Sequence, residues 1–474
     1  VWWSLSAGLL FAFFPFSYQA VAVYGHNVHP TTTGILLLGL HTYLFAHAGR
    51  KFWWLPTALL FGLGLLSHES AILFGPFAFL VQWAHDGQCP IQRRRPVTTY
   101  LRAAWFLFSL GGFLYLIGYQ FLPLSRAPQA DTGGGGAWSA KGLYILQTLA
   151  YPLVWVARYL PSAAGNWIII SGIGIVVGLS AWSARVASRR PGLVLGLGWW
   201  GLASLLIALP LSATYLLHGP RLLYLGSVGL ALLWPLLLAP FKRFSSLVPA
   251  LLLVLILVQN GLFVRQKLQE YATLTGPVDV VRETLADQPA GEGVLLVNLP
   301  QWLAPARNTY PAGVEIVSML GDYLFVEELL AYNLGVDRPV KAIRLTETLA
   351  DPEDYRFGVH QQADLAELQS DWAPAGQHFF LVEYAEGGPQ TAYTGSIRPT
   401  TSETSPLANF ESFSLLAAEA AQCGESITVA LEWLANDRPV APTTSIFVQL
   451  LATDGSLLAQ ADGPPLGLRP DLLD

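Results

Sequence analysis

The chain has 474 residues, of which 53% are hydrophobic and only 12% are charged. A soluble domain carries about 25% charged residues, so a chain that is soluble throughout is excluded. The charges are also unevenly distributed. Up to Lys267 there are seventeen Lys and Arg but three acids, a net charge of +14, whereas the remainder has nine basic residues and twenty-nine acids, a net charge of −20. We therefore expect a membrane-embedded region followed by an acidic soluble region.

The two ends suggest a fragment. The chain opens at Val1 in apolar sequence without Met or a basic segment, which is not how a signal peptide begins. It ends at Asp474 in turn-like sequence that directly follows strand-like runs. We expect further sequence at both ends.

Nine stretches are candidate membrane spans, since a helix needs about 20 apolar residues to cross the hydrocarbon core. They are 2–24, 31–48, 53–67, 70–84, 98–121, 166–184, 192–214, 221–239 and 244–264.

Basic clusters set the orientation of these spans. They occur at 50–51, 93–95, 185–190 and 242–243, and the positive-inside rule places them in the cytoplasm. Five spans that start inside place residues 122–141 outside, and the cluster at 185–190 must lie inside. Only one span can therefore lie between residues 142 and 184. The segment 142–160 contains Gln147, Pro152 and Arg158, so we assign it to an amphipathic helix at the outer interface. The predicted fold is an α-helical polytopic bundle of about nine spans plus this interfacial helix, with an extracytoplasmic C-terminal region. Cys89 then lies inside and Cys423 outside, which implies no disulfide.

Short strands between helices characterise the acidic region. The runs 293–299, 314–320 and 378–384 are typical of buried strands, with helices expected near 277–287 and 323–334. Apolar residues alternate over 427–433, and Asp454-Gly455 predicts a hairpin. We expect a membrane domain over 1–267, an α/β domain over 268–398, and the start of a β-sandwich over 399–474, after a linker at 397–406.

Polar groups at the outer ends of spans are the candidate functional residues. In the loop 24–30, His26 and His29 are spaced to bind a metal or a phosphate, but a solvated turn before a helix capped by Thr31 is the favoured interpretation, because no acidic partner is nearby. In the turn 67–70, His68 precedes Glu69, and an acid at a membrane edge indicates function. The alternative is a carboxylate that caps the next helix.

A third group lies at the outer end of the span that begins near residue 221. His218 and Arg221 lie there, and Arg binds phosphate through two parallel hydrogen bonds. Tyr224 follows one turn deeper on nearly the same face. Interfacial anchoring is the alternative. In the glycine-rich loop 126–142 we expect mobility rather than a phosphate cradle, with Arg126, Lys141 and Arg158 available to attract an anion. No zinc spacing, nucleophile elbow or nucleic-acid-binding motif is present.

Three of these segments resemble the GT-C superfamily of polyprenyl-phosphate-sugar-dependent glycosyltransferases, especially bacterial relatives of protein O-mannosyltransferases. LLFAFFPFSYQAVAVYGHN (9–27) is similar to a family segment at the end of a middle span. LLFGLGLLSHESAILFGPFAFL (59–80) is similar to the family's "LALLSKE…P" segment, and HGPRLLYLGSVGLALL (218–233) to a late "RYLYLPSAG" segment. The resemblance covers roughly residues 5–267, and the sandwich run also looks like a domain appended to such proteins in some bacteria.

The chain departs from the family at several positions. Gln19 stands where the family usually has Glu, His26 where it has Arg, and His68 where it has Lys. The family's catalytic Asp lies on the first outer loop, and no carboxylate precedes Glu69 here. We therefore expect the general base upstream of Val1, and this chain alone to be inactive.

The resemblance implies transfer of a sugar, with inversion, from a polyprenyl-phosphate carrier to a protein or glycan acceptor outside a bacterial cytoplasmic membrane. Arg221 and His218, with Tyr224 and Arg158, would bind the lipid phosphate. Glu69, with His68, His26 and His29, would orient those groups or a divalent cation. The alternatives from other classes are a lipid-linked-glycan transporter, whose polar residues should line a midplane path, and a non-catalytic glycan-assembly protein. Membrane lipid is an expected partner and nucleic acid is not.

Overall fold

The computed structural model describes residues 2–22, 27–88, 104–120, 135–161, 164–245, 247–286, 292–318, 340–343, 353–359, 377–397, 405–410, 413–423, 426–435 and 446–463. The chain divides into two compact units. The first comprises Val1–Ala272 with Trp302–Gly321, and the second Thr273–Gln301 with Asp322–Asp474. The expected boundaries at 267 and 398 stay a prediction.

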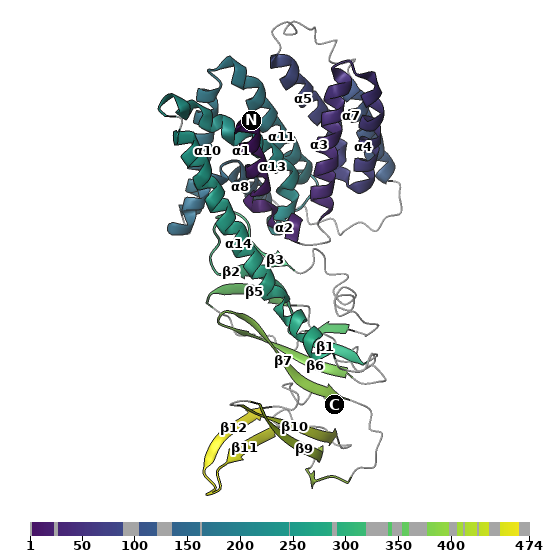
Figure 1. Cartoon of the computed structure of the whole chain (residues 1–474), viewed down its shortest axis with the longest axis vertical. Coiled ribbons are helices and arrows are strands. Elements are labelled where there is room, and N and C mark those ends of the chain that lie inside the picture. The colour runs from purple at the N-terminus through teal and green to yellow at the C-terminus, as the bar shows by residue number, and fades with distance from the viewer. Residues whose placement is uncertain are drawn as a thin grey trace. The chain divides into compact units, whose positions relative to one another are not determined.

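Helices build nearly all of the first unit (Figure 1). They are α1 (Trp2–Ala12), η1 (Pro15–Ser17), α2 (Tyr18–Ala22), α3 (Val28–His47), η3 (Lys51–Trp53), α4 (Trp54–Ser67), η4 (Glu69–Leu73), α5 (Phe74–Gln88), α7 (Ala104–Gln120), α8 (Gly135–Leu149), α9 (Tyr151–Val154), η5 (Trp155–Tyr159), α10 (Gly165–Ser183), η7 (Ala187–Arg189), α11 (Arg190–Ala208), α12 (Ala213–His218), η8 (Pro220–Leu223), α13 (Tyr224–Leu238), η9 (Ala239–Arg243) and α14 (Leu247–Thr284).

The expectation of nine membrane spans is wrong. In the described part of the chain, four helical segments are long and apolar enough to cross a membrane, 165–183, 187–208, 220–243 and 247–284, and a fifth arises if the bent pair α1 and α2 forms one span. The first expected span breaks at Pro15, with a bend of 46°. These helices support association with a membrane.

Other expected spans are too short, too polar or described only in part. α4 has 14 residues, which is below the usual length of a span. α7 covers 17 residues of the expected span 98–121, whose two ends lie outside the described residues. α3 has 20 residues, but its sequence includes four Thr and three His, which lower its hydropathy. The segment 142–160, expected at the interface, forms the end of α8 with the short helices α9 and η5.

Helix α13 forms the core of the bundle. Thirteen of its fifteen residues are buried, against helices that include α1 and α11. Gly196 of α11 and Gly229 of α13 let two backbones approach closely, since a Cβ at Gly229 would lie 2.5 Å from the Gly196 carbonyl oxygen. Only glycine permits this crossing, in agreement with the small residues that membrane helices place at their contacts.

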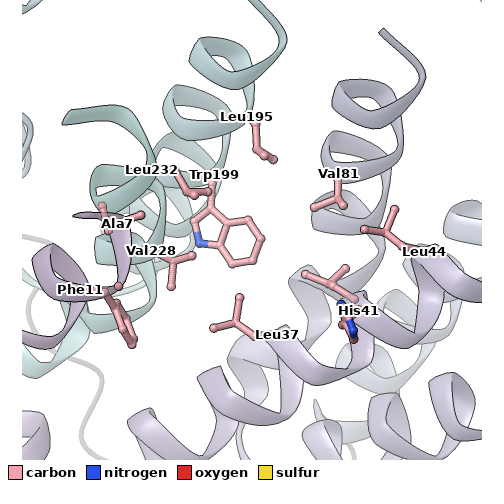
Figure 2. A pocket seen from close by; sticks show the side chains of 13 residues that line it. Ala7, Phe11, Leu37, His41, Leu44, Val81, Leu195, Trp199, Val228 and Leu232 are labelled. Carbon is pink, nitrogen blue, oxygen red and sulfur yellow. The ribbon is translucent and has the colours of Figure 1, made fainter. Parts of the chain in front are cut away.

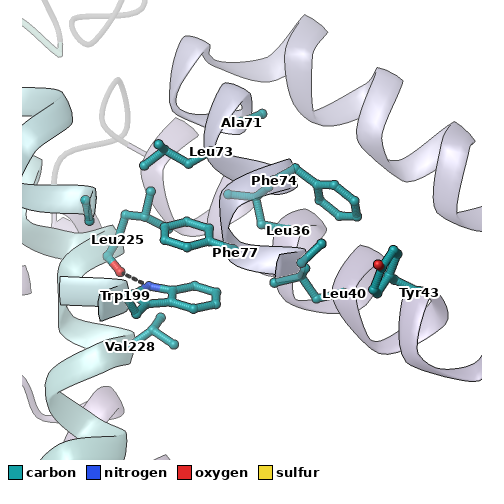
Figure 3. Close-up of a cluster of buried hydrophobic side chains, with 12 residues drawn as sticks. Leu36, Leu40, Tyr43, Ala71, Leu73, Phe74, Phe77, Trp199, Leu225 and Val228 are labelled. Carbon is teal, nitrogen blue, oxygen red and sulfur yellow. Dashed lines mark hydrogen bonds between the residues drawn. The ribbon is translucent and has the colours of Figure 1, made fainter. Parts of the chain in front are cut away.

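Two helix breaks lie at the same end of the bundle. η4 precedes α5 and η8 precedes α13, and the first turns of α5 and α13 meet at one residue of α11 (Figure 3). Phe77 stacks on Trp199 with ring centroids 3.8 Å apart, and the indole of Trp199 donates to the Leu225 carbonyl at 2.9 Å. The cluster that contains these residues is buried and apolar. The packing therefore brings the turn at Glu69 and the turn at Arg221 to one end of the bundle.

A strand pair and a loop from beyond α14 also belong to the first unit. β2 (Pro300–Pro305) pairs antiparallel with β3 (Val317–Ser318), with Trp302 opposite Ser318. We call residues 302–318 the return segment, because the chain comes back to the bundle there. Within it the run expected as a strand over 314–320 forms only β3 among the described residues.

The second unit is rich in strands. Its mixed sheet has the order β4-β1-β6-β7, in which β1 (Gly293–Val297) is parallel to β4 (Val340–Ile343) and β6 (Gln377–Ala385), and β7 (Gly388–Ile397) is antiparallel to β6. β5 (Tyr355–Val359) lies between β4 and β6 in sequence. The expected strands at 293–299 and 378–384 are confirmed. The helix expected near 277–287 is instead the end of α14, and the one expected near 323–334 lies outside the described residues, like most of the linker.

The last strands are antiparallel. β8 (Ala408–Asn409), β9 (Phe413–Cys423) and β10 (Ser426–Ala435) form one sheet in the order β10-β9-β8, and β11 (Ile446–Leu451) pairs with β12 (Leu457–Gly463). The hairpin expected at Asp454-Gly455 is confirmed, and Gly455 has the positive φ of 82° that its turn requires. The structure thus bears out a helical region followed by a β-rich region.

Candidate functional site at one end of the helix bundle

Arg221 is a buried cation in the turn before α13. Pro220 starts the tight helix η8, and only 6% of Arg221 is exposed. Its Nη1 donates to Oε1 of Gln19 at 3.3 Å, and its Nη2 donates to the hydroxyl of Tyr215 at 3.0 Å. The guanidinium carbon also lies 5.3 Å from the centre of the Tyr215 ring. Two neutral groups therefore fix the guanidinium.

Gln19 connects Arg221 to two backbone segments. It is fully buried in α2, and its Nε2 donates to the carbonyl oxygens of His218 at 3.1 Å and of Ile316 at 3.0 Å. Because both carbonyls can only accept, the amide nitrogen must face them and Oε1 must face Arg221. The orientation of the amide is thus determined by its partners.

The return segment is held to this end of the bundle by side chains of three helices. Tyr18 donates from its hydroxyl to the Ile316 carbonyl at 2.9 Å. Gln147 of α8 donates to the Ala312 carbonyl at 2.7 Å and accepts from the Ala312 amide at 2.8 Å. A two-point amide contact of this kind fixes one residue of the segment as a strand neighbour would.

Lys267 of α14 anchors the same segment with a buried charge. Its Nζ donates to the Glu270 carboxylate at 2.8 Å and to the Glu315 carbonyl at 2.6 Å, and Oε2 of Glu315 lies 3.9 Å away. The Glu315 carboxylate accepts from the amides of Thr309 at 3.0 Å and Tyr310 at 2.5 Å. Burial raises the pKa of Glu315, while Lys267 and the two amides oppose that rise.

Arg221 and Lys267 therefore differ in their charge balance, while a third buried cation, Lys141, donates to the Ala208 carbonyl at 3.1 Å. Lys267 faces two carboxylates, Glu270 and Glu315. Among the residues that the structure describes, no ion pair joins Arg221 to any carboxylate; its partners are an amide and a phenol. An unpaired buried charge is costly, so an anion that binds beside Arg221 would recover much of that cost.

An apolar cleft of about 350 Å³ lies between α1, α3, α5, α11 and α13, the helix that follows the turn of Arg221 (Figure 2). Phe11, which lines it, packs edge-on against Tyr224 with ring centroids 5.2 Å apart. Apart from His41, every side chain of the lining is apolar. The lining comprises Ala7, Gly8, Phe11, Leu37, Leu40, His41, Leu44, Val81, Leu195, Trp199, Val228, Ala231 and Leu232. Such a cleft suits a hydrocarbon chain.

A second polar cluster surrounds His68, at the same end of the bundle. His68 is extended, and its Nδ1 accepts from the Ser70 amide at 3.1 Å, which caps η4. The His29 ring lies 4.9 Å from the His68 ring, and Glu69 Oε2 lies 3.6 Å from His68 Nδ1. Burial lowers the pKa of His68, while Glu69 opposes that effect. The side chain of Glu69 is 57% exposed, so His68 and not Glu69 caps the turn.

The other predicted residues have varied positions. The ring of His218 bonds its own helix, Nδ1 to the Thr214 carbonyl at 2.7 Å, and only its backbone reaches Gln19. Arg158 is exposed and stacks on Trp155 and Tyr159, as an interfacial anchor would. His26 lies outside the described residues, and so does most of the glycine-rich loop.

The described contacts do not join the two polar clusters. Neither Glu69 nor His68 has a contact with Arg221 among them, although both turns lie at one end of the bundle. Within the described residues there is also no group of three or more His, Cys, Asp or Glu side chains arranged to hold a metal. Thr31, expected as a helix cap, lies inside α3, which begins at Val28.

Sequence reasoning missed Lys267, Glu315 and the return segment. Glu315 looked like one of many acids in the acidic region, and 48 residues separate it from Lys267. One signal was available: Lys267 and Glu270 are three residues apart just after the expected span 244–264, a spacing at which oppositely charged side chains on a helix pair.

Comparison of the chain with protein-family models, with curated proteins and with solved structures gives no match.

Proposed function

We propose that the chain is the membrane part of a GT-C-type glycosyltransferase, which transfers a sugar from a polyprenyl-phosphate carrier to an extracytoplasmic protein or glycan. One observation carries the proposal: Arg221 is a buried cation whose described partners are all neutral, and the helix that follows it lines an apolar cleft with Val228, Ala231 and Leu232. Those two features match the two ends of such a carrier, an anionic headgroup and a hydrocarbon chain. The proposed location is a bacterial cytoplasmic membrane, crossed several times.

The proposed chemistry assigns Arg221 to the leaving group. The acceptor hydroxyl oxygen attacks the anomeric carbon, the bond from that carbon to the phosphate oxygen breaks, and the prenyl phosphate leaves with one more negative charge. A guanidinium beside that oxygen stabilises the charge as it develops. The proton of the acceptor goes to a carboxylate that acts as general base.

The cleft would bind the first isoprene units of the carrier. Val228 lies seven residues after Arg221 on one continuous helical path, which corresponds to about 10 Å. A phosphate headgroup bound at Arg221 would therefore place the first isoprene units of the carrier near the cleft. Each buried methylene contributes about 0.8 kcal/mol, so a few isoprene units bind firmly.

The test is sugar transfer by the full-length gene product in membranes. Arg221→Gln should lower kcat/KM for a polyprenyl-phosphate sugar by about 10²–10³, the usual loss when one donor to a developing oxyanion is removed. Arg221→Lys, which keeps the charge but not the paired donors, should retain part of the activity. Lys51→Gln is the control, because Lys51 is exposed and precedes α4, at the opposite end of that helix from His68. This variant should transfer the sugar normally. Normal turnover by Arg221→Gln would contradict the proposal.

A further inference from the structure

We propose that Gln19 is a positioning residue that keeps the charge of Arg221 available to an anionic ligand. The inference rests on the proposed function and adds to it a residue with a specific role. Gln19 holds the guanidinium by a hydrogen bond of 3.3 Å without neutralising it. The glutamate that the resembled family usually has at this position would hold the guanidinium as well, but would also neutralise part of its charge, so this chain departs from the family in leaving that charge available.

The surroundings of Gln19 require an amide. Two carbonyl oxygens, those of His218 and Ile316, each accept from Nε2, so the site needs a donor on one side. Arg221 is itself a donor, so the site needs an acceptor on the other side. Among the side chains of this length, only glutamine supplies two donors, one for each carbonyl, together with an acceptor and no charge.

Gln19 also links the cation to two parts of the fold. One carbonyl, that of His218, belongs to the turn that carries Arg221, and the other, that of Ile316, belongs to the return segment. The guanidinium is therefore placed relative to the return segment as well as to its own helix. A ligand at Arg221 binds to a preorganised group.

Gln147 provides a matched control. It is also a fully buried glutamine, and it also binds the return segment through its amide, at Ala312. Its described contacts do not include Arg221. Replacing either glutamine by glutamate introduces one buried acid and places an oxygen against a backbone carbonyl of the return segment; Gln19→Glu also does so at the His218 carbonyl. Only Gln19→Glu places the acid against the guanidinium.

The experiment measures binding of farnesyl phosphate and of farnesol to the full chain in detergent. For the unmodified protein we expect tighter binding of farnesyl phosphate, a preference that Arg221→Gln removes. Gln19→Glu should reduce the affinity for farnesyl phosphate at least tenfold at neutral pH while leaving that for farnesol unchanged. Gln147→Glu should preserve both affinities.

A pH series separates the effect of charge from damage to the fold. Protonation of the introduced acid would restore a neutral partner for Arg221. The affinity of Gln19→Glu for farnesyl phosphate, divided by that of the unmodified protein at the same pH, should therefore rise as the pH falls. A preference for the phosphate that depends on Arg221 but is unaffected in Gln19→Glu would overturn the role of Gln19 alone. Absence of that preference from the unmodified protein would overturn both this role and the proposed function.

Discussion

At the scale of single residues, one end of the bundle holds a buried charge that has charged partners and another that has none among the described residues. Lys267 lies among two carboxylates and a carbonyl, whereas Arg221 has only neutral described partners. The first arrangement is structural, because it ties the return segment to α14. The second is what a binding site for an anion requires.

Lys267→Met tests the structural role of the first arrangement. Removing one partner of a buried pair costs about 3–5 kcal/mol, because the remaining carboxylates are left uncompensated. We expect a lower midpoint of thermal unfolding in detergent. The difference in midpoint between Lys267→Met and the unmodified protein should shrink as the pH falls. The raised pKa of Glu315 means that its carboxyl becomes neutral at a higher pH than an ordinary Glu, and a neutral carboxyl no longer needs the lysine. Arg265→Met, two residues away and exposed, is the control and should unfold as the unmodified protein does. An equal midpoint for both variants would contradict this role.

Sequence reasoning found Arg221 but not its surroundings. A single arginine between apolar runs is visible in the sequence, because its charge is out of place there. Its partner Gln19 lies 202 residues from it in sequence, and the carbonyl of Ile316 that orients Gln19 lies 297 residues from Gln19. A backbone carbonyl has no signature in the sequence. For the same reason His218 and Arg158 were predicted to bind phosphate from their type alone.

At the scale of elements, helix breaks limited the prediction. Hydropathy identified 2–24 as one span, but Pro15 divides it into α1 and α2, and α14 continues as one helix far past its apolar part. The breaks at η1, η4 and η8 are where polar side chains gather. Short helices such as α4 then explain why the count of nine spans failed.

Gly229→Ala tests the close crossing of α11 and α13. A Cβ there would lie 2.5 Å from a carbonyl oxygen and 2.7 Å from the Trp200 amide nitrogen, and backbone atoms cannot move aside. We expect a loss of about 1–3 kcal/mol in unfolding free energy, as for other overpacked cores. Gly201→Ala, on the same helix as Trp200 but with no neighbouring atom within 4 Å, should cause no loss. Equal stability of both variants would mean that the helices do not cross there.

At the scale of the whole molecule, composition predicted a division that the structure retains only in part. The basic apolar region and the acidic strand-rich region exist as expected. Residues 302–321, however, lie within the acidic part of the sequence and belong to the helical unit. Side-chain contacts to Ile316, Ala312 and Glu315 decide that placement, and no property of the segment's composition reveals it.

The central claim is that one ligand occupies both the guanidinium of Arg221 and the apolar cleft. Photolabelling with a prenyl phosphate that carries a diazirine in its second isoprene unit, followed by peptide mapping, tests it most directly. We predict labelling of cleft residues such as Phe11, Trp199 or Val228, and its loss in Arg221→Gln. Labelling that spreads over the lipid-facing surface of α14 and is unchanged in Arg221→Gln would contradict the claim.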